Sequence, residues 1–454
     1  MSYISQMSFQ NPWWVDKNRI LEDEHVKRAK VIVPPIDESA LILGPRQVGK
    51  TTFLKTTIKT LLEREDPRSI LFFSCDAFSK KEELISLVNE YRTLVNREKS
   101  AYIFLDEITS VRDWNTALLH LFNAGYFNDS LIYVTGSSSI NLRKEMLPGR
   151  PIKKYVFYPL NFRVYFNTFY KKLIQDHVKV DEKDELYENA LKLLPYISEL
   201  NKALLEYIRR GGFFATSFSE NPLSLYEAYK DAILSEFLKT ERKESMFKVI
   251  IRKIIEGYGS RISENTIAKD VNVSHTTIGD YLDVLEKLFI IRTFRKIEGG
   301  GKTNYRSLKK VYFIDPFFFR VMKIYSVGKD IDDIEIPLIV EGIVGEHLAR
   351  EYKEVGYLHF KSGKEVDFSV GNVKVEVKWR REKEKKRYNN VDYVLTIDEF
   401  KKSDEQLTLP VSIFLYLVSS DKFFYELTSI SYIGFNSSGE YYSISPGLGK
   451  HGRK

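Results

Sequence analysis

The distribution of apolar residues divides the chain into an N-terminal α/β part and a longer part of mixed character. Short apolar runs alternate with polar, helix-like stretches over residues 1–170. Because a strand covered by helices on both faces is apolar throughout, such runs predict the strands of a parallel sheet. The predicted strands cover residues 40–43, 70–75, 101–105, 131–134 and 154–158.

Residues 171–245 have the period of amphipathic helices and predict a helical unit. A charged run at 179–188 predicts a solvated face. After Pro195, apolar residues return at helical spacing and predict a buried face. That face contains Ile197, Leu200, Leu204 and Ile208.

The centre of residues 246–315 has the pattern of two short helices around a tight turn. A helix over 264–270 and a turn over 271–273 precede Ser274, whose hydroxyl is placed to cap a second helix that reaches Leu288. The apolar positions of this second helix fall on one face. The pattern predicts a helix-turn-helix.

Two strands, over 289–297 and 305–313, are predicted to follow these helices and to form a basic wing. Helices and wing together predict a winged helix-turn-helix, in which the exposed start of the second helix faces the DNA major groove. The alternative is that this unit makes only intramolecular or protein contacts. The groove-facing residues would be His275, Thr276, Thr277 and Asp280, and the wing cations would be Arg292, Arg295, Lys302, Arg306, Lys309 and Lys310.

Residues 316–454 contain the pattern of a β-hairpin. Polar and apolar residues alternate strictly over 365–370 and 373–378, with two turn residues between them. This register places Asp367 opposite Glu376. Opposed carboxylates repel each other by about 0.2–1 kcal/mol unless a cation or a proton lies between them. The hairpin therefore predicts a candidate cation site.

Composition and charge narrow the function classes only slightly. No stretch approaches the ~20 apolar residues of a transmembrane helix, and the polar N-terminus lacks the pattern of a signal peptide, so we expect a cytoplasmic protein. The net charge of +7 is compatible with nucleic-acid binding but is also ordinary for 454 residues. The single cysteine, Cys75, cannot form an internal disulfide and falls in a predicted strand.

A phosphate-binding loop connects the first predicted strand to the helix-like stretch after it. Residues 44–51 read G-x-x-x-x-G-K-T, a loop whose backbone N–H groups wrap phosphates in front of a helix N-terminus. Lys50 would contact the β and γ phosphates, and the Thr51 hydroxyl would bind Mg²⁺. The predicted nucleotide site contains Gly44, Pro45, Arg46, Gln47, Val48, Gly49, Lys50, Thr51 and Thr52.

Acidic and hydroxyl residues follow two further strands, at the same expected edge of the sheet. Asp106 would hold the Mg²⁺ hydration shell, and Glu107 would orient and deprotonate the water that attacks the γ phosphate. Ser137 or Ser138 could sense that phosphate. Arg150 could offer its charge to the ATP of a neighbouring subunit, or it could simply be solvated. These residues favour ATP hydrolysis over binding alone.

The order of these motifs resembles that of the AAA+ superfamily ATPases common in archaea and bacteria. The resemblance covers most of the chain, and its motifs are most diagnostic in the first domain. The Arg-Gly-Gly-Phe turn at 210–213 resembles a turn of the helical lid in that family, although Phe214 stands where proline is frequent. The segments that carry the resemblance are 44–51, 105–107, 135–139, 147–150, 158–162, 210–213 and 312–316.

The resemblance implies a P-loop AAA+ parallel sheet with a helical lid, then a winged helix-turn-helix, then a small α/β restriction-endonuclease-like domain. The hairpin resembles the PD-(D/E)xK nuclease core, in which Asp367 and Glu376 would bind Mg²⁺ and Lys378 would steady the attacking water. A further acid, Glu341 or Glu346, would come from an upstream helix. A purely structural role for these charges also stays open. The implied domains are the AAA+ core at 1–170, the lid at 171–245, the winged helix-turn-helix at 246–315 and the endonuclease-like domain at 316–454.

We therefore expect a Mg²⁺-dependent, ATP-binding and ATP-hydrolysing AAA+ ATPase that acts on or near DNA. Its cofactors would be ATP and Mg²⁺, its DNA contacts would come from the winged helix and the C-terminal domain, and it could form a homo-oligomer without contacting a membrane. Two other functions stay open. One is an ATP-gated nuclease that uses the C-terminal site, and the other is an ATP-driven switch that remodels a protein partner without nucleic acid.

Overall fold

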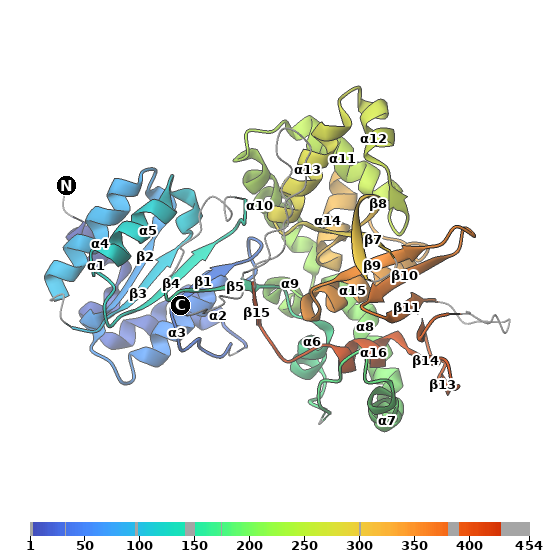
Figure 1. The fold of residues 1–454 in the computed structure, drawn as a ribbon. Helices are drawn as coiled ribbons and strands as arrows, with labels where there is room; N and C mark the ends of the chain where they lie inside the picture. The colour runs from blue at the N-terminus through green and yellow to red at the C-terminus, as the bar shows by residue number, and fades with distance from the viewer. Residues whose placement is uncertain are drawn as a thin grey trace, which may run out of the picture.

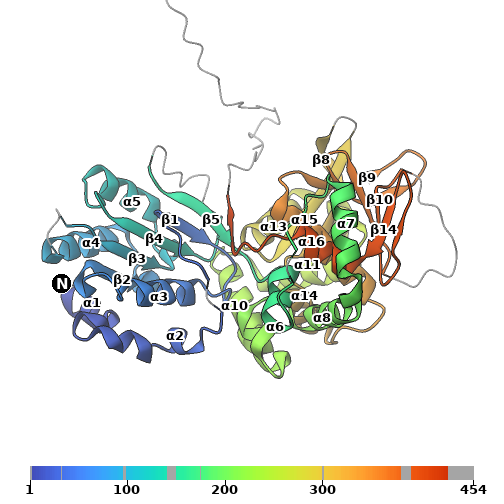
Figure 2. The ribbon, with the colours of Figure 1, turned by 90° about the horizontal axis from the view of Figure 1, so that it is seen from below.

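The computed structural model contains two β-sheets with helices packed around them (Figure 1). The N-terminal sheet and its helices lie on one side of the molecule and the rest of the chain lies on the other, in both views (Figure 2). Within the part of the chain that the structure describes, no helix is both long and apolar enough to cross a lipid bilayer. Structure is described for residues 3–31, 33–95, 99–140, 150–173, 175–298, 301–379 and 390–427.

The first sheet contains the strands that the apolar runs predicted, so that prediction is confirmed. They are β1 (Ala40–Leu43), β2 (Ile70–Ser74), β3 (Tyr102–Asp106), β4 (Leu131–Gly136) and β5 (Lys153–Phe157). All five are parallel, in the order β5-β1-β4-β3-β2. Their carboxyl ends therefore meet at one edge of the sheet, where the loops that carry the predicted site begin.

Helices cover both faces of this sheet, as expected for strands that are apolar throughout. They are α2 (Glu24–Arg28), α3 (Lys50–Leu61), α4 (Lys81–Val95) and α5 (Trp114–Asn123). The pair α4 and α5 lies on one face, and α2 and α3 lie on the other (Figure 1, Figure 2). The sheet is therefore the middle layer of a three-layer arrangement.

An N-terminal segment covers the outer edge of β2. The buried carboxamide of Asn11 pairs with Phe72 as a neighbouring strand would: it donates to the Phe72 carbonyl at 2.8 Å and accepts from the Phe72 N–H at 2.6 Å. The indole N–H groups of Trp13 and Trp14 both donate to the carbonyl of Ile70. The segment protects a strand edge that would otherwise expose unpaired backbone groups.

The helices that follow the first sheet do not form one continuous lid. They are α6 (Phe162–Phe169), α7 (Lys183–Leu193), α8 (Ile197–Arg210), α9 (Phe214–Phe218) and α10 (Tyr226–Leu238). Both α7 and α8 pack against α16 (Val411–Val418) in the C-terminal part. In contrast, α9 and α10 contact the phosphate loop, and α10 lies at the boundary between the two halves (Figure 1, Figure 2). The segment predicted as a lid therefore packs largely on the second half, and α9 and α10 also reach the phosphate loop.

The predicted helix-turn-helix segment and its strands are present as elements. They are α11 (Glu244–Glu256), β6 (Arg261–Ile262), α12 (Glu264–Val271), α13 (His275–Lys287), β7 (Ile291–Glu298) and β8 (Lys302–Phe313). The Ser274 hydroxyl caps α13 by accepting from the Thr277 N–H, as predicted. The strands β7 and β8 pair antiparallel, and β6 adds to the far side of β8.

The C-terminal strands continue the same sheet. They are β9 (Val355–His359), β10 (Glu365–Val370), β11 (Val373–Val377), β12 (Tyr393–Thr396), β13 (Lys401–Lys402) and β14 (Leu407–Pro410). A parallel contact of β7 with β9 gives the order β13-β14-β12-β11-β10-β9-β7-β8-β6. The units predicted at 246–315 and 316–454 thus share one sheet. The hairpin pairs Val370 with Val373, which confirms the predicted register.

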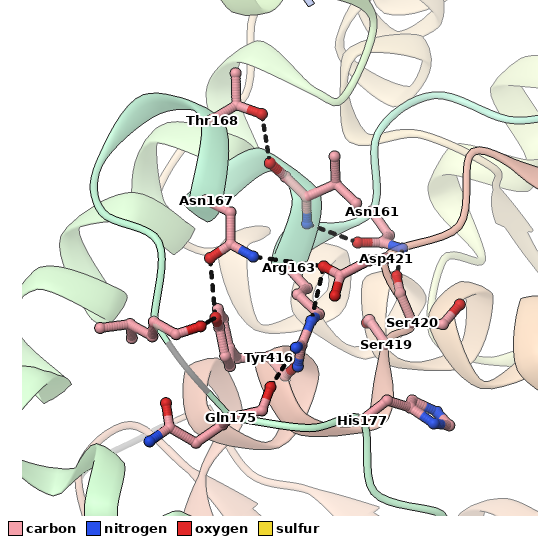
Figure 3. Close-up of polar contacts among 12 residues, drawn as sticks. Asn161, Arg163, Asn167, Thr168, Gln175, His177, Tyr416, Ser419, Ser420 and Asp421 are labelled. Carbon is pink, nitrogen blue, oxygen red and sulfur yellow. Dashed lines mark hydrogen bonds and ion pairs between the residues drawn. The ribbon is translucent and has the colours of Figure 1, made fainter. Parts of the chain in front are cut away.

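Polar contacts fasten the segment after α16 to α6 (Figure 3). Arg163 of α6 pairs with Asp421 at 2.9 Å and donates to the Tyr416 carbonyl at 3.2 Å. The side chain of Asn161 donates to the Ser420 carbonyl at 2.8 Å. The chain then forms β15 (Phe424–Glu426), which pairs antiparallel with β5.

Three segments of the family resemblance meet at a buried junction between the two halves. The Leu160 N–H donates to the Gly212 carbonyl at 2.7 Å, and the Gly212 N–H donates to Asp315 at 2.7 Å. A Cβ at Gly212 would lie 2.1 Å from the Leu160 carbonyl oxygen, so the turn requires glycine. Burial raises the pKa of Asp315 to about 6. Asp315 begins α14 (Pro316–Val327), which is followed by α15 (Ile336–Glu351).

Candidate nucleotide site

The phosphate loop lies at the carboxyl edge of the first sheet, between β1 and α3. Gly49 has φ of +108°, a left-handed conformation that favours glycine. At Gly44, a Cβ would lie 2.3 Å from the Phe157 carbonyl oxygen of the neighbouring strand. The backbone can therefore close around a small anion only because both positions lack a side chain. Lys50 follows directly as the first residue of α3.

Residues from two strands, one helix and the phosphate loop are bonded together at this edge. The Thr51 hydroxyl donates to Asp106 Oδ2 at 2.7 Å, and the Thr135 hydroxyl donates to Asp106 Oδ1 at 2.5 Å. The buried Lys50 Nζ donates to the carbonyls of Gly44 and Pro45, at 3.0 and 3.1 Å. The structure thus brings together the predicted Mg²⁺ ligands and the predicted phosphate-binding lysine.

Glu107 is held in a conformation that aims its carboxylate at the phosphate loop. Its φ of +52° lies in the left-handed region, which is uncommon for a residue with a side chain. The Glu107 N–H donates to Thr135 Oγ1 at 2.9 Å, and Glu107 Oε1 lies 3.7 Å from Lys50 Nζ. Its other oxygen, Oε2, is buried and accepts no hydrogen bond from the residues that the structure describes. A buried acceptor of this kind suits a water molecule, so the residues present fit ATP and Mg²⁺.

Ser137 lies at this edge but is bonded to a residue that the sequence did not single out. Its hydroxyl donates to Glu236 Oε2 of α10 at 2.8 Å, while Glu236 Oε1 lies 2.6 Å from Arg46 Nε. Burial raises the pKa of Glu236, but hydrogen bonding and charge from Lys239 and the charge of Arg46 outweigh it, so the pKa is lowered. Glu236 is therefore an anion beside the phosphate loop. No local pattern in the sequence draws attention to it.

The loops of the nucleotide site touch both halves of the molecule. Gln47 donates to the Ala228 carbonyl of α10 at 2.9 Å. The N–H and hydroxyl of Ser139 donate to the Lys287 carbonyl at the end of α13, at 2.9 and 3.0 Å. A conformational change at the phosphate end of the site would therefore alter its contacts with α10 and α13 in the second half of the chain.

Arg150 lies at the opposite edge of the sheet from the phosphate loop. It precedes Lys153, which pairs with Ala40 at the start of β1, whereas the phosphate loop follows the end of β1. Its side chain donates to Asn123 Oδ1 of the same chain. Arg150 cannot reach the phosphates of its own subunit, and its role toward a neighbouring subunit stays a prediction. The preceding residues of its motif, 147–149, lie outside the described residues.

The predicted nuclease site holds a lysine where a metal was expected. Lys310 Nζ of β8 lies 2.9 Å from Glu341 Oε1, 2.7 Å from Glu365 Oε1 and 3.2 Å from Asp367 Oδ1. Lys378 pairs with Glu376 at 2.6 Å. Among the residues that the structure describes, no group of three or more acidic, histidine or cysteine side chains is arranged to hold a metal ion. The arrangement of these side chains does not fit the predicted Mg²⁺ site.

Glu346 does not belong to this cluster, so of the two alternatives only Glu341 approaches Asp367. Glu346 is buried and accepts from Arg292 Nη2 and Arg350 Nε, each at 3.1 Å. The sequence could not separate the two acids, because both lie on α15.

Several predicted wing cations are engaged within the chain. Arg292 pairs with Glu346, Lys309 pairs with Glu264, and Lys310 is buried. The expectation that all of them face DNA is therefore wrong for these three. Lys302 and Arg306 are exposed, and so are His275, Thr276 and Asp280 near the start of α13.

Two family models match the chain. Residues 201–326 match one described as a domain of unknown function (DUF8612), and residues 37–166 match one described as an AAA domain. The second match spans the phosphate loop, Asp106, Glu107 and Ser137. Residues 37–166 are therefore similar to AAA domains. The match supports the resemblance to AAA+ P-loop ATPases for this part, and with it nucleotide binding and ATPase activity.

Similar proteins and structures add little about function. Uncharacterized protein MJ1637 of Methanocaldococcus jannaschii is 24% identical over 340 residues, which cover 70% of this chain and 69% of that protein. An uncharacterized protein of Haemophilus influenzae is 24% identical over 351 residues, which cover 72% and 78%. The crystal structure of Cdc6p from Pyrobaculum aerophilum aligns with 75% of this chain and 95% of that one at 11% identity. Its TM-score of 0.23 is too low to establish a shared overall fold.

Proposed function

We propose that the chain is a Mg²⁺-dependent ATPase of the AAA+ kind that acts on or near DNA. The observation that carries the proposal is the bonded set of Thr51, Asp106 and Thr135 beside the unpaired buried oxygen of Glu107. A metal ligand, a phosphate-binding lysine and a candidate base converge there on one edge of a sheet. A protein that only bound ATP would not require a base at that position.

Each residue has a distinct role in this proposal. Thr51 and Asp106 would hold Mg²⁺, which when bound supplies positive charge to the phosphates. Lys50 would exchange the carbonyls of Gly44 and Pro45 for the β and γ phosphates. Glu107 would accept a proton from the attacking water through its buried Oε2. Ser137 would contact the γ phosphate once it is released from Glu236.

The contacts of Glu236 favour a coupling between ATP and the rest of the chain. A γ phosphate is an anion that competes with the Glu236 carboxylate for the same donors, Ser137 and Arg46. ATP binding would therefore loosen α10 from the phosphate loop. This supports, as a second candidate function, an ATP-driven switch that moves the second half of the chain against a protein partner.

The DNA part of the proposal rests on the exposed start of α13. We propose that residues 246–315 act as a winged helix-turn-helix with Thr276 and its neighbours toward the major groove. Because ATP is the substrate, the proposed place of action is the cytoplasm. A homo-oligomer would allow Arg150 to face the ATP of a neighbouring subunit.

DNA binding is tested by titrating duplex DNA at several salt concentrations while phosphate release is followed. We expect an affinity that falls steeply with salt, because phosphate contacts release counterions. A Thr276→Glu variant should bind DNA at least about tenfold more weakly, since it adds a negative charge at the groove-facing helix start. Its control, Thr60→Glu, changes an exposed threonine of α3. Salt-independent binding, or equal losses in both variants, would favour the protein-partner switch.

A further inference from the structure

Glu341, Glu365 and Asp367 form an acidic cluster around the ammonium group of Lys310, which comes from the distant strand β8. We propose that Lys310 occupies the place of a divalent metal in this cluster and keeps metal ions out while β8 is docked. The ion pairs of Lys310 would then hold the β6–β8 strands against the C-terminal strands. This inference goes beyond the proposed ATPase function and does not depend on it.

The geometry places the Lys310 ammonium at the centre of three carboxylates from two elements. Glu365 and Asp367 come from β10, and Glu341 comes from α15. The three contacts, at 2.7 to 3.2 Å, are charge-assisted hydrogen-bond distances. Lys310 is 1% exposed, so solvent does not compete with these contacts. A divalent ion bound to the same oxygens at about 2.0–2.6 Å would overlap the ammonium.

Several other oxygens of the cluster also accept hydrogen bonds or pair with cations from within the chain. The Tyr312 hydroxyl donates to Glu341, and the Val377 N–H donates to Asp367 Oδ2 at 2.9 Å. Lys378 pairs with Glu376 at 2.6 Å. The Arg261 guanidinium lies 3.0 Å from Glu365. Protein donors therefore offset most of the negative charge that would otherwise attract a metal.

Lys310 cannot leave the cluster without a change in the sheet. On β8 it pairs with Phe294 of β7 on one side and with Arg261 of β6 on the other. Its backbone is therefore held by strands on both sides. Metal exclusion is a property of the docked sheet, and withdrawal of β8 would expose the three carboxylates together.

The test is a titration of the nucleotide-free, full-length chain with Mn²⁺, in which free Mn²⁺ is measured by electron paramagnetic resonance. We expect the wild-type chain to show no binding that depends on Asp367. Lys310→Met removes the charge and nearly conserves the side-chain volume. It should bind Mn²⁺ at least about tenfold more tightly than the wild type, because an ammonium no longer repels the ion.

Two further variants test whether new Mn²⁺ binding depends on Lys310 and on the carboxylates of the cluster. The control Lys309→Met removes the neighbouring lysine, which pairs with Glu264 outside the cluster, and should bind Mn²⁺ no better than the wild type. Adding Asp367→Asn to Lys310→Met should abolish the new binding. Mn²⁺ should also raise the melting temperature of Lys310→Met but not of Lys309→Met.

Two results would overturn the inference. One is Mn²⁺ binding by the wild-type chain that is lost in Asp367→Asn, and the other is a folded Lys310→Met that binds no Mn²⁺. A Lys310→Met chain that folds only when Mn²⁺ is present would support it, because the metal would then replace the missing cation. If that variant does not fold in either condition, Lys310→Gln is titrated in its place with the same expectation. Neither of these two results would bear on the proposal that the chain binds ATP.

Discussion

Glu107→Gln should hydrolyse ATP about 10²–10⁴-fold more slowly than the wild-type chain while binding ATP with similar affinity. A general base contributes a factor of this size, and an amide cannot accept the proton of the attacking water. The glutamine keeps the size of the side chain and the strained backbone position at φ +52°. Steady-state phosphate release and equilibrium ATP binding measure the two quantities separately.

A matched control is Glu63→Gln, which changes an exposed glutamate just after α3. It should leave turnover and affinity unchanged. Normal turnover in Glu107→Gln would remove Glu107 from the role of base. Loss of ATP binding in Glu107→Gln would instead indicate that Glu107 maintains the shape of the phosphate loop through its 3.7 Å contact with Lys50.

Glu346→Gln should destabilise the folded chain by about 3–5 kcal/mol, the usual cost of removing one partner from a buried ion pair. Glu346 is 2% exposed and is the shared anion of Arg292 and Arg350. Arg350 in turn donates to the carbonyls of Pro159 and Ile314, so the network joins segments from both halves. Urea unfolding followed by tryptophan fluorescence and circular dichroism measures the loss.

The control for this variant is Glu256→Gln. Glu256 also pairs with two cations, Arg252 at 2.9 Å and Lys253 at 3.3 Å, but it is partly exposed to solvent. We expect a loss of at most about 1 kcal/mol, because water screens an exposed pair. Equal losses in the two variants would show that burial of the Glu346 network contributes nothing to stability.

The sequence predicted the features that depend on neighbouring residues. The first sheet followed from apolar runs, the phosphate loop from its glycines and Lys50, and the α13 cap from Ser274. The register of the hairpin followed from strict alternation and a two-residue turn, and the pairing of Val370 with Val373 confirms it.

Features that depend on distant residues were not predicted. Lys310 was interpreted as a wing cation because it lies among other lysines and arginines, yet the last four residues of β8, from Lys310 to Phe313, are all buried. Its acidic partners lie 31 to 57 residues further along the chain. Glu236 contacts Ser137 across 99 residues. No local pattern identifies contacts at such separations.

The domain boundaries could not be predicted from the sequence, for a related reason. The hairpin β7–β8 and the C-terminal strands form one sheet because Lys296 pairs with Tyr357, a contact that neither segment shows by itself. Strand β15 is only three residues long, and it joins the first sheet because α6 holds the preceding segment through Arg163 and Asp421. Such short strands have too little pattern to be recognised.

The central claim is that residues 44–51 and the acidic pair beside them bind ATP with Mg²⁺. Calorimetric titration of the nucleotide-free chain tests it most directly. We predict that the wild-type chain binds a single ATP, and that Lys50→Ala, which removes the phosphate-binding charge, shows a large loss of affinity. A folded wild-type chain that produces no binding heat with ATP and Mg²⁺ at several temperatures would contradict the account.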